Sequence, residues 1–190
     1  MSSFDPQAYG AAMSPLLAID RYRALDGGAP DRDVPPALGQ LSLAEAFAPE
    51  RIRDEAAARA CLAGLWLLHD RLDESHAVSQ GIDTPSGSFW HGIMHRREGD
   101  FGNAKYWFRR VGDHPAYEPL PAAAAALAAT APQRTWAERL APGGRWDPYA
   151  LVDACQTAQR DPGDLAPFCR RVQQAEWESL WDFCYRSAIG

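Results

Sequence analysis

Apolar side chains recur along this chain with the spacing of an α-helix, and no long run alternates apolar with polar residues as a half-buried strand would. Val, Ile and Thr are scarce, whereas Ala and Leu, which favour helices, are plentiful. We therefore expect an all-α fold of stacked antiparallel helical hairpins. The predicted helices cover residues 6–24, 49–69, 73–80, 88–98, 101–111, 120–129, 135–140, 149–159 and 166–188.

The length of 190 residues fits one domain, and 46% hydrophobic residues suffice for its core. We expect a single all-α domain over residues 1–190. The breaker-rich stretch 26–40 is predicted to be a loop or a partly mobile arm. Ser42, with Glu45 three residues later, has the spacing of a helix-capping box.

The net charge, the apolar runs and the cysteine pattern limit the kinds of partner and the compartment expected for this protein. A net charge of −6 argues against general nucleic-acid binding. No run of 18 apolar residues occurs, so no membrane span is expected. The four cysteines form no CxxC pair and are expected to be buried thiols of a soluble, cytoplasmic protein. The aromatic last helix is compatible with a homodimer and equally with core packing.

Residues 88–115 form two short helices separated by a glycine turn. This stretch resembles a tetratricopeptide repeat, a 34-residue helix-turn-helix unit. The resemblance implies that small residues let the two helices approach closely while an aromatic ring fills the groove beside them. The matching positions are Gly92, Gly99, Asp100, Ala104, Phe108 and Pro115.

The same stretch carries a longer block, HGIMHRREGDF followed by NAKYWFRRVG and HP, after a Ser79-Gln80 turn. It resembles a family of uncharacterised bacterial and fungal proteins that carry this block. The resemblance covers about forty residues and implies specialisation of the segment, without implying an activity.

The five histidines all fall between residues 69 and 114. His91 and His95 are four residues apart and share one helix face, which Glu98 can join. Two imidazoles and a carboxylate can ligate Zn, Fe, Mn or Ni, so His91, His95 and Glu98 are a candidate site for a divalent metal. His76 from the preceding helix could add a ligand. The alternative is that these histidines are packing residues that hydrogen-bond their neighbours.

A basic cluster occupies the same two helices. Arginine side chains bind carboxylates and phosphates bidentately, so the cluster predicts a pocket for a small anionic or polar ligand. The alternative is a set of ion pairs with nearby acidic residues. The predicted ligand-binding residues are Arg96, Arg97, Lys105, Tyr106 and Arg109.

Catalysis is a further possibility for the histidines, because an imidazole titrates near neutral pH. His76, His91 and His95 are the candidate catalytic residues, although no nucleophile elbow, phosphate-binding loop or dinucleotide motif accompanies them. The sequence thus favours a small-ligand-binding protein, possibly an enzyme. A tetratricopeptide-like adaptor that binds a peptide or protein in an open groove is one alternative, and a histidine-ligated metalloenzyme is another.

Overall fold

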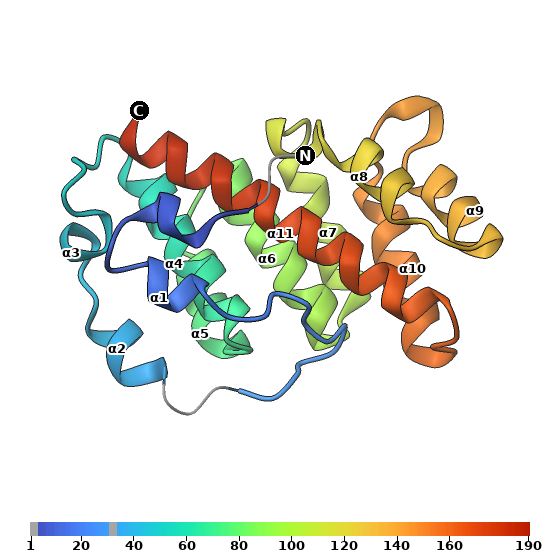
Figure 1. Ribbon diagram of the computed structural model, residues 1–190, viewed down its shortest axis with the longest axis horizontal. Coiled ribbons are helices and arrows are strands. Elements are labelled where there is room, and N and C mark those ends of the chain that lie inside the picture. Colours follow the sequence, from blue (N-terminus) through green and yellow to red (C-terminus); the bar gives the residue numbers. More distant parts are fainter. Residues whose placement is uncertain (1–3, 31–33) are drawn as a thin grey trace.

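The computed structural model describes residues 4–30 and 34–190, and within these ranges the chain is helical with no strand, which confirms the all-α expectation (Figure 1). The 3-10 helices are η1 (Pro6–Tyr9), η2 (Pro115–Tyr117) and η3 (Pro142–Gly144). The α-helices are α1 (Ser14–Leu17), α2 (Val34–Gln40), α3 (Leu43–Phe47), α4 (Glu55–Leu68), α5 (Leu72–Ser79), α6 (Pro85–Glu98), α7 (Phe101–Val111), α8 (Leu120–Leu127), α9 (Ala131–Leu140), α10 (Pro148–Arg160) and α11 (Leu165–Ile189).

The N-terminal third departs most from the expected elements. The long helix expected over residues 6–24 is instead η1 and α1 with irregular chain around them, because Gly10 adopts a left-handed φ of 80° and ends the first turn. Residues 34–40, expected to be a loop, form α2. Residues 31–33 of that expected loop lie outside the described ranges.

Side-chain caps fix several helix starts. Ser42 and Glu45 form the expected capping box at α3. The helix expected from residue 49 begins at Glu55, because the Asp54 side chain accepts the Ala57 N–H and ends the preceding irregular chain. Helices α5 to α11 follow the predicted order. Helix α7 has the predicted bounds of 101–111, and the other helices have ends within four residues of the prediction.

Consecutive helices from α4 to α7 each pack against the next, and α11 crosses α4, α8 and α10 as a long diagonal (Figure 1). The C-terminal half of α11 shares one hydrophobic core with α4 and α6. Its N-terminal half shares a second core with α8, α9 and α10. The 25-residue helix therefore joins the two cores.

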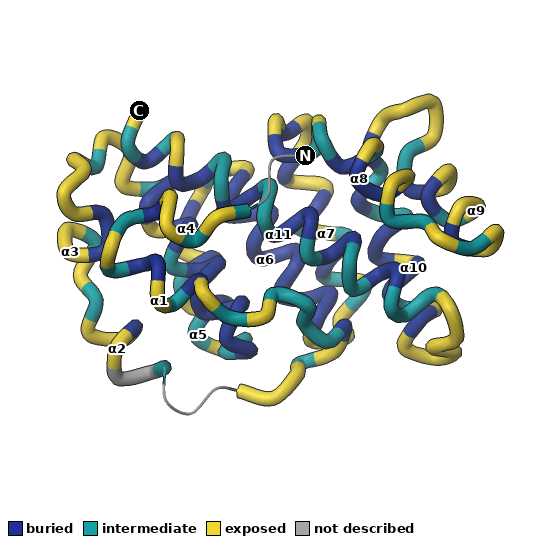
Figure 2. The backbone as a smooth tube through the Cα atoms, in the orientation of Figure 1, coloured by how far each residue is buried: buried dark blue, intermediate teal, exposed yellow. Residues whose placement is uncertain are grey.

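Helix α6 lies at the centre and is buried on nearly every side, so it is dark blue over most of its length in Figure 2. Small residues make this burial possible. A Cβ at Gly92 would lie 3.1 Å from the Phe108 ring of α7, and one at Gly64 of α4 would lie 2.8 Å from Trp90. Because α6 is also rich in polar residues, each buried polar side chain needs a partner inside the protein.

None of the helices in the described residues combines the length and apolar character needed to cross a bilayer. The four cysteines are buried thiols rather than disulfides.

Candidate metal centre

Three histidines from two adjacent helices meet at one point. His76 comes from α5, and His91 and His95 lie one turn apart on α6. One ring nitrogen from each lies within 4.8 Å of the others. The ring centroid of His76 lies 4.6 Å from that of His91 and 5.4 Å from that of His95. The α5–α6 packing thus assembles a cluster of three imidazoles.

Ser79 of α5 hydrogen-bonds to His91. The Ser79 hydroxyl donates to the backbone carbonyl of His76 at 3.3 Å, and its oxygen lies 3.3 Å from Nδ1 of His91. In the tautomer of His91 that carries its proton on Nδ1, this nitrogen donates to Ser79 while the hydroxyl donates to the carbonyl, so all of these polar groups are paired. That tautomer leaves Nε2 of His91 with its lone pair.

The same logic applies to His95. Its Nδ1 lies 2.9 Å from the Glu98 carboxylate, an acceptor only, so Nδ1 carries the proton. Nε2 of His95 lies 3.1 Å from the Asn103 amide nitrogen, which donates to its lone pair. The carboxylate thus orients the ring and leaves Nε2 unprotonated, with Asn103 as its hydrogen-bond donor. Carboxylates orient many metal-bound histidines in the same way.

Burial keeps His91 uncharged near neutral pH. His91 is 2% exposed and His95 5% exposed. Burial, followed by the proximity of His95 and His76, lowers the pKa of His91 to about 3. The Trp107 ring stacks on His91 with centroids 4.0 Å apart and shields that side from water. A neutral imidazole is the form that binds a metal, so protons do not compete for His91 near pH 7.

The donor set suits a borderline transition metal. Imidazole ligates Zn²⁺ at 2.0–2.1 Å, and in a tetrahedral site the ligand nitrogens are then about 3.3 Å apart. A spacing of up to 4.8 Å means that the rings must close by about 1 Å or more around an ion. Glu98, predicted as a ligand, contacts Nδ1 of His95 instead, and His76 completes the group of three.

The predicted anion-binding arginines point elsewhere. Arg96 is fully buried and forms a bidentate pair with Glu176 of α11, with a shortest contact of 2.5 Å. Arg97 is 2% exposed and donates to Asp70 at 2.6 Å and to the carbonyls of Leu67 and Asp26. Their guanidiniums are committed to carboxylates and carbonyls inside the protein.

Burial and the paired carboxylate act in opposite directions on the pKa of each guanidinium. Burial acts to lower the pKa of Arg96, but Glu176 more than offsets it, so the net shift is upward. Burial outweighs Asp70 at Arg97, whose pKa is lowered. These two arginines therefore hold α6 in place rather than face a ligand.

The remaining predicted ligand-binding residues are spread along α7. Lys105 pairs with Asp153 of α10 at 2.5 Å. Tyr106 is 47% exposed and packs edge-on against Trp107. Arg109 lines a separate cleft. The structure does not bring Lys105, Tyr106 and Arg109 together with Arg96 and Arg97 in one pocket.

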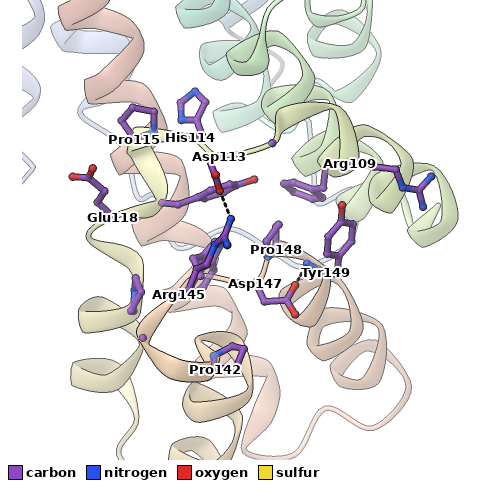
Figure 3. A pocket seen from close by; sticks show the side chains of 16 residues that line it. Arg109, Asp113, His114, Pro115, Glu118, Pro142, Arg145, Asp147, Pro148 and Tyr149 are labelled. Atoms are coloured by element: carbon purple, nitrogen blue, oxygen red, sulfur yellow. Dashed lines mark hydrogen bonds and ion pairs between the residues drawn. The ribbon is translucent and has the colours of Figure 1, made fainter.

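The cleft has a volume of about 1020 Å³ and lies beyond the C-terminal end of α7. One wall is formed by Phe108, Arg109, residues 112–115, Tyr117, Glu118 and Pro121, and the other by Pro142 and residues 144–149. Figure 3 shows Arg145 reaching across to Asp113 in an exposed ion pair, while Arg109 extends away from the other labelled side chains. A mixture of aromatic and polar lining residues is typical of small-ligand sites.

His114 at the edge of this cleft contacts Ser86, but the pair is not a nucleophile and its base. Nδ1 of His114 accepts the Ala116 N–H at 3.1 Å, so the proton sits on Nε2 and is donated to the Ser86 oxygen at 3.1 Å. Burial lowers the pKa of His114 to about 4, consistent with a neutral ring. A base would need Nε2 unprotonated toward the serine.

Sequence reasoning missed Asn103 and the role of Glu98 behind His95. The hairpin turn at Gly99 offers a signal, because residues 95 and 103 are each four positions from it and face each other across antiparallel helices. The position of Ser79 on α5, one turn after His76, is the sequence signal for its place beside the cluster.

Comparison with known proteins gives no relative to argue from: no family model, curated protein or solved structure matches this chain. The resemblance to tetratricopeptide repeats stays a prediction, and the arguments below rest on the geometry of the chain itself.

Proposed function

We propose that this protein binds a divalent transition metal, with Zn²⁺ the best fit, through His76, His91 and His95. The observation that carries the proposal is the convergence of three imidazole nitrogens within 4.8 Å in a mostly buried site. Hydrogen bonds to Ser79 and Glu98 support it, because Glu98 leaves Nε2 of His95 without a proton and Ser79 can accept from Nδ1–H of His91. Histidine-only sets suit Zn²⁺, Cu²⁺, Ni²⁺ or Fe²⁺ better than Mg²⁺ or Ca²⁺.

The test uses untagged protein stripped of metal and then titrated with Zn²⁺. At 100 times the dissociation constant, a bound ion stabilises a fold by about 2.7 kcal/mol. For a chain of this size that raises the melting temperature by about 5–10 °C. One Zn²⁺ per chain, measured by plasma mass spectrometry after dialysis, should accompany the shift.

The variants are chosen to keep the fold. An asparagine amide nitrogen mimics the Nδ1–H of histidine while lacking Nε2. His91→Asn and His95→Asn therefore preserve the bonds to Ser79 and Glu98 and should abolish the shift. His114→Asn is the matched control, because its amide oxygen can accept the Ala116 N–H and it lies outside the cluster. Equal Zn²⁺ binding by all three variants would refute the proposal.

A second candidate function is binding of a small polar molecule in the cleft, and the supporting observation is its volume of about 1020 Å³ beside Tyr149 and Arg145. A thermal-shift screen of polar metabolites should give a hit that Tyr149→Ala abolishes. No hit with the intact protein would count against this candidate.

We also propose a cytoplasmic location. Four buried, unbridged thiols support it, because secreted domains commonly oxidise their cysteines to disulfides.

A further inference from the structure

The three histidines fill only part of a metal's coordination sphere. In the described residues no fourth His, Cys, Asp or Glu joins the group of His76, His91 and His95. Glu98 is bonded to Nδ1 of His95, on the far side of the ring from Nε2. Structural zinc sites are closed by four protein ligands, whereas catalytic ones have three and keep one position for water or substrate.

Access to that position is one-sided. His91 and His95 are buried, and Trp107 covers the ring face of His91. His76 is only half-buried, so the cluster is open to solvent on the α5 side. Exchange of a ligand on a bound ion would therefore take place past His76, the most exposed of the three rings.

Asn103 adds a hydrogen-bond donor at this point. Its amide nitrogen lies 3.1 Å from Nε2 of His95, the atom whose lone pair the ion would take. Asn103 lies in the first turn of α7, whose start is fixed by Asp100 accepting the Asn103 backbone N–H at 3.0 Å. A metal on Nε2 would displace the Asn103 amide from this lone pair, and the freed N–H would need a new acceptor, which a ligand of the ion could supply.

We propose that the metal centre has one open coordination position, which binds water and exchanges it for a small carboxylate-type oxyanion, with Asn103 donating a hydrogen bond to the bound oxygen. This inference rests on the proposed function and names the class of ligand for the same site. The metal neutralises the anion, and the amide selects an oxygen ligand over a simple halide.

The test uses the Co²⁺-substituted protein, whose visible absorption reports the ligands around the ion, and acetohydroxamate as the probe. Adding acetohydroxamate should change the visible bands with a saturable, one-site dependence, because the probe displaces water from the open position. Acetate should produce a weaker change of the same kind, and chloride at equal ionic strength should produce none.

Asn103→Ala should still bind one Co²⁺ per chain but bind acetohydroxamate about 10-fold or more weakly, the usual effect of deleting a hydrogen bond to a charged ligand. Gln174→Ala is the matched control: it removes an amide of α11 that donates to Glu178 at 2.9 Å, and it should change neither binding.

The outcomes separate the two proposals. Failure of the intact protein to bind Co²⁺ or Zn²⁺ overturns both the proposed function and this inference. Stoichiometric Co²⁺ binding with bands that ignore acetohydroxamate overturns the open position alone. An unchanged affinity for acetohydroxamate in Asn103→Ala removes the role assigned to the amide.

Discussion

Replacing Arg96 with methionine should destabilise this protein more than most single substitutions. The side chain is fully buried and pairs with Glu176, which is also fully buried, across the contact between α6 and α11. Methionine keeps a similar unbranched shape but removes the positive charge. The Glu176 carboxylate is then left inside the protein without its partner.

The expected magnitude follows from that burial. Breaking a buried ion pair by removing one member costs about 3–5 kcal/mol, because the other charge stays desolvated. In a chain of this length each kcal/mol lowers the melting temperature by about 2–4 °C. Arg96→Met should therefore melt about 6–20 °C below the parent protein, with a matching fall in the urea midpoint.

Two further variants make the measurement specific. Arg96→Met combined with Glu176→Leu should recover much of the loss, since no lone charge remains. Arg186→Met breaks the exposed pair with Asp182, whose contact is 2.7 Å, and should cost less than about 1 kcal/mol. If Arg96→Met lost no more stability than Arg186→Met by circular dichroism, the argument from buried charge would be refuted.

Three other outcomes follow from the described contacts. Burial lowers the pKa of His114 to about 4, so between pH 6.5 and 4 the unfolded chain binds a proton at this residue that the folded chain does not. The contribution of His114 to stability should be intact above pH 6.5 and fall by up to about 3 kcal/mol toward pH 4. His91, whose pKa is also lowered, acts in the same direction, so His114→Asn should remove only the His114 part of the pH dependence in urea unfolding. Gly92→Leu should cost about 3 kcal/mol, because even a Cβ there lies 3.1 Å from Phe108, and an unchanged urea midpoint would contradict the close helix contact. Glu98→Ala should weaken Zn²⁺ binding about 10–100-fold in a chelator competition, because the ring of His95 loses its orienting carboxylate, and unaltered affinity would argue that the carboxylate plays no part.

The sequence predicted helix ends correctly where the residues that fix them are close together in the chain. The capping box of Ser42 and Glu45 acts within one turn, and the glycine turn between α6 and α7 needs only its own residues. The prediction of one helix over residues 6–24 was wrong. Gly10, with its positive φ, ends the helix after a single 3-10 turn. Residues 34–40 form a helix despite their breakers.

The roles of the arginines could not be read from the sequence because their partners are distant. Arg96 pairs with a carboxylate 80 residues later, and Arg97 pairs with one 27 residues earlier. A basic cluster on two helices indicates a ligand surface only if the helices are exposed there. The burial of α6 on nearly all sides depends on the tertiary packing. It places the arginines predicted to bind a ligand in the interior, where they form buried ion pairs instead.

The histidine cluster could be predicted from the sequence only in part. The spacing of His91 and His95 on one helix face is local and was sufficient to nominate them. Glu98 follows the same face, but its contact with Nδ1 rather than a shared metal position depends on side-chain geometry. His76 joins through the packing of α5 on α6, which periodicity alone does not specify.

The metal centre is tested most directly by X-ray absorption spectroscopy of the untagged protein loaded with one Zn²⁺ per chain. The geometry predicts three imidazole nitrogens and one further light atom at about 2.0–2.1 Å, with the imidazole signal reduced in His91→Asn. Sulfur scattering at about 2.3 Å, an all-oxygen shell, or a spectrum unchanged by His91→Asn would contradict a centre built from His76, His91 and His95.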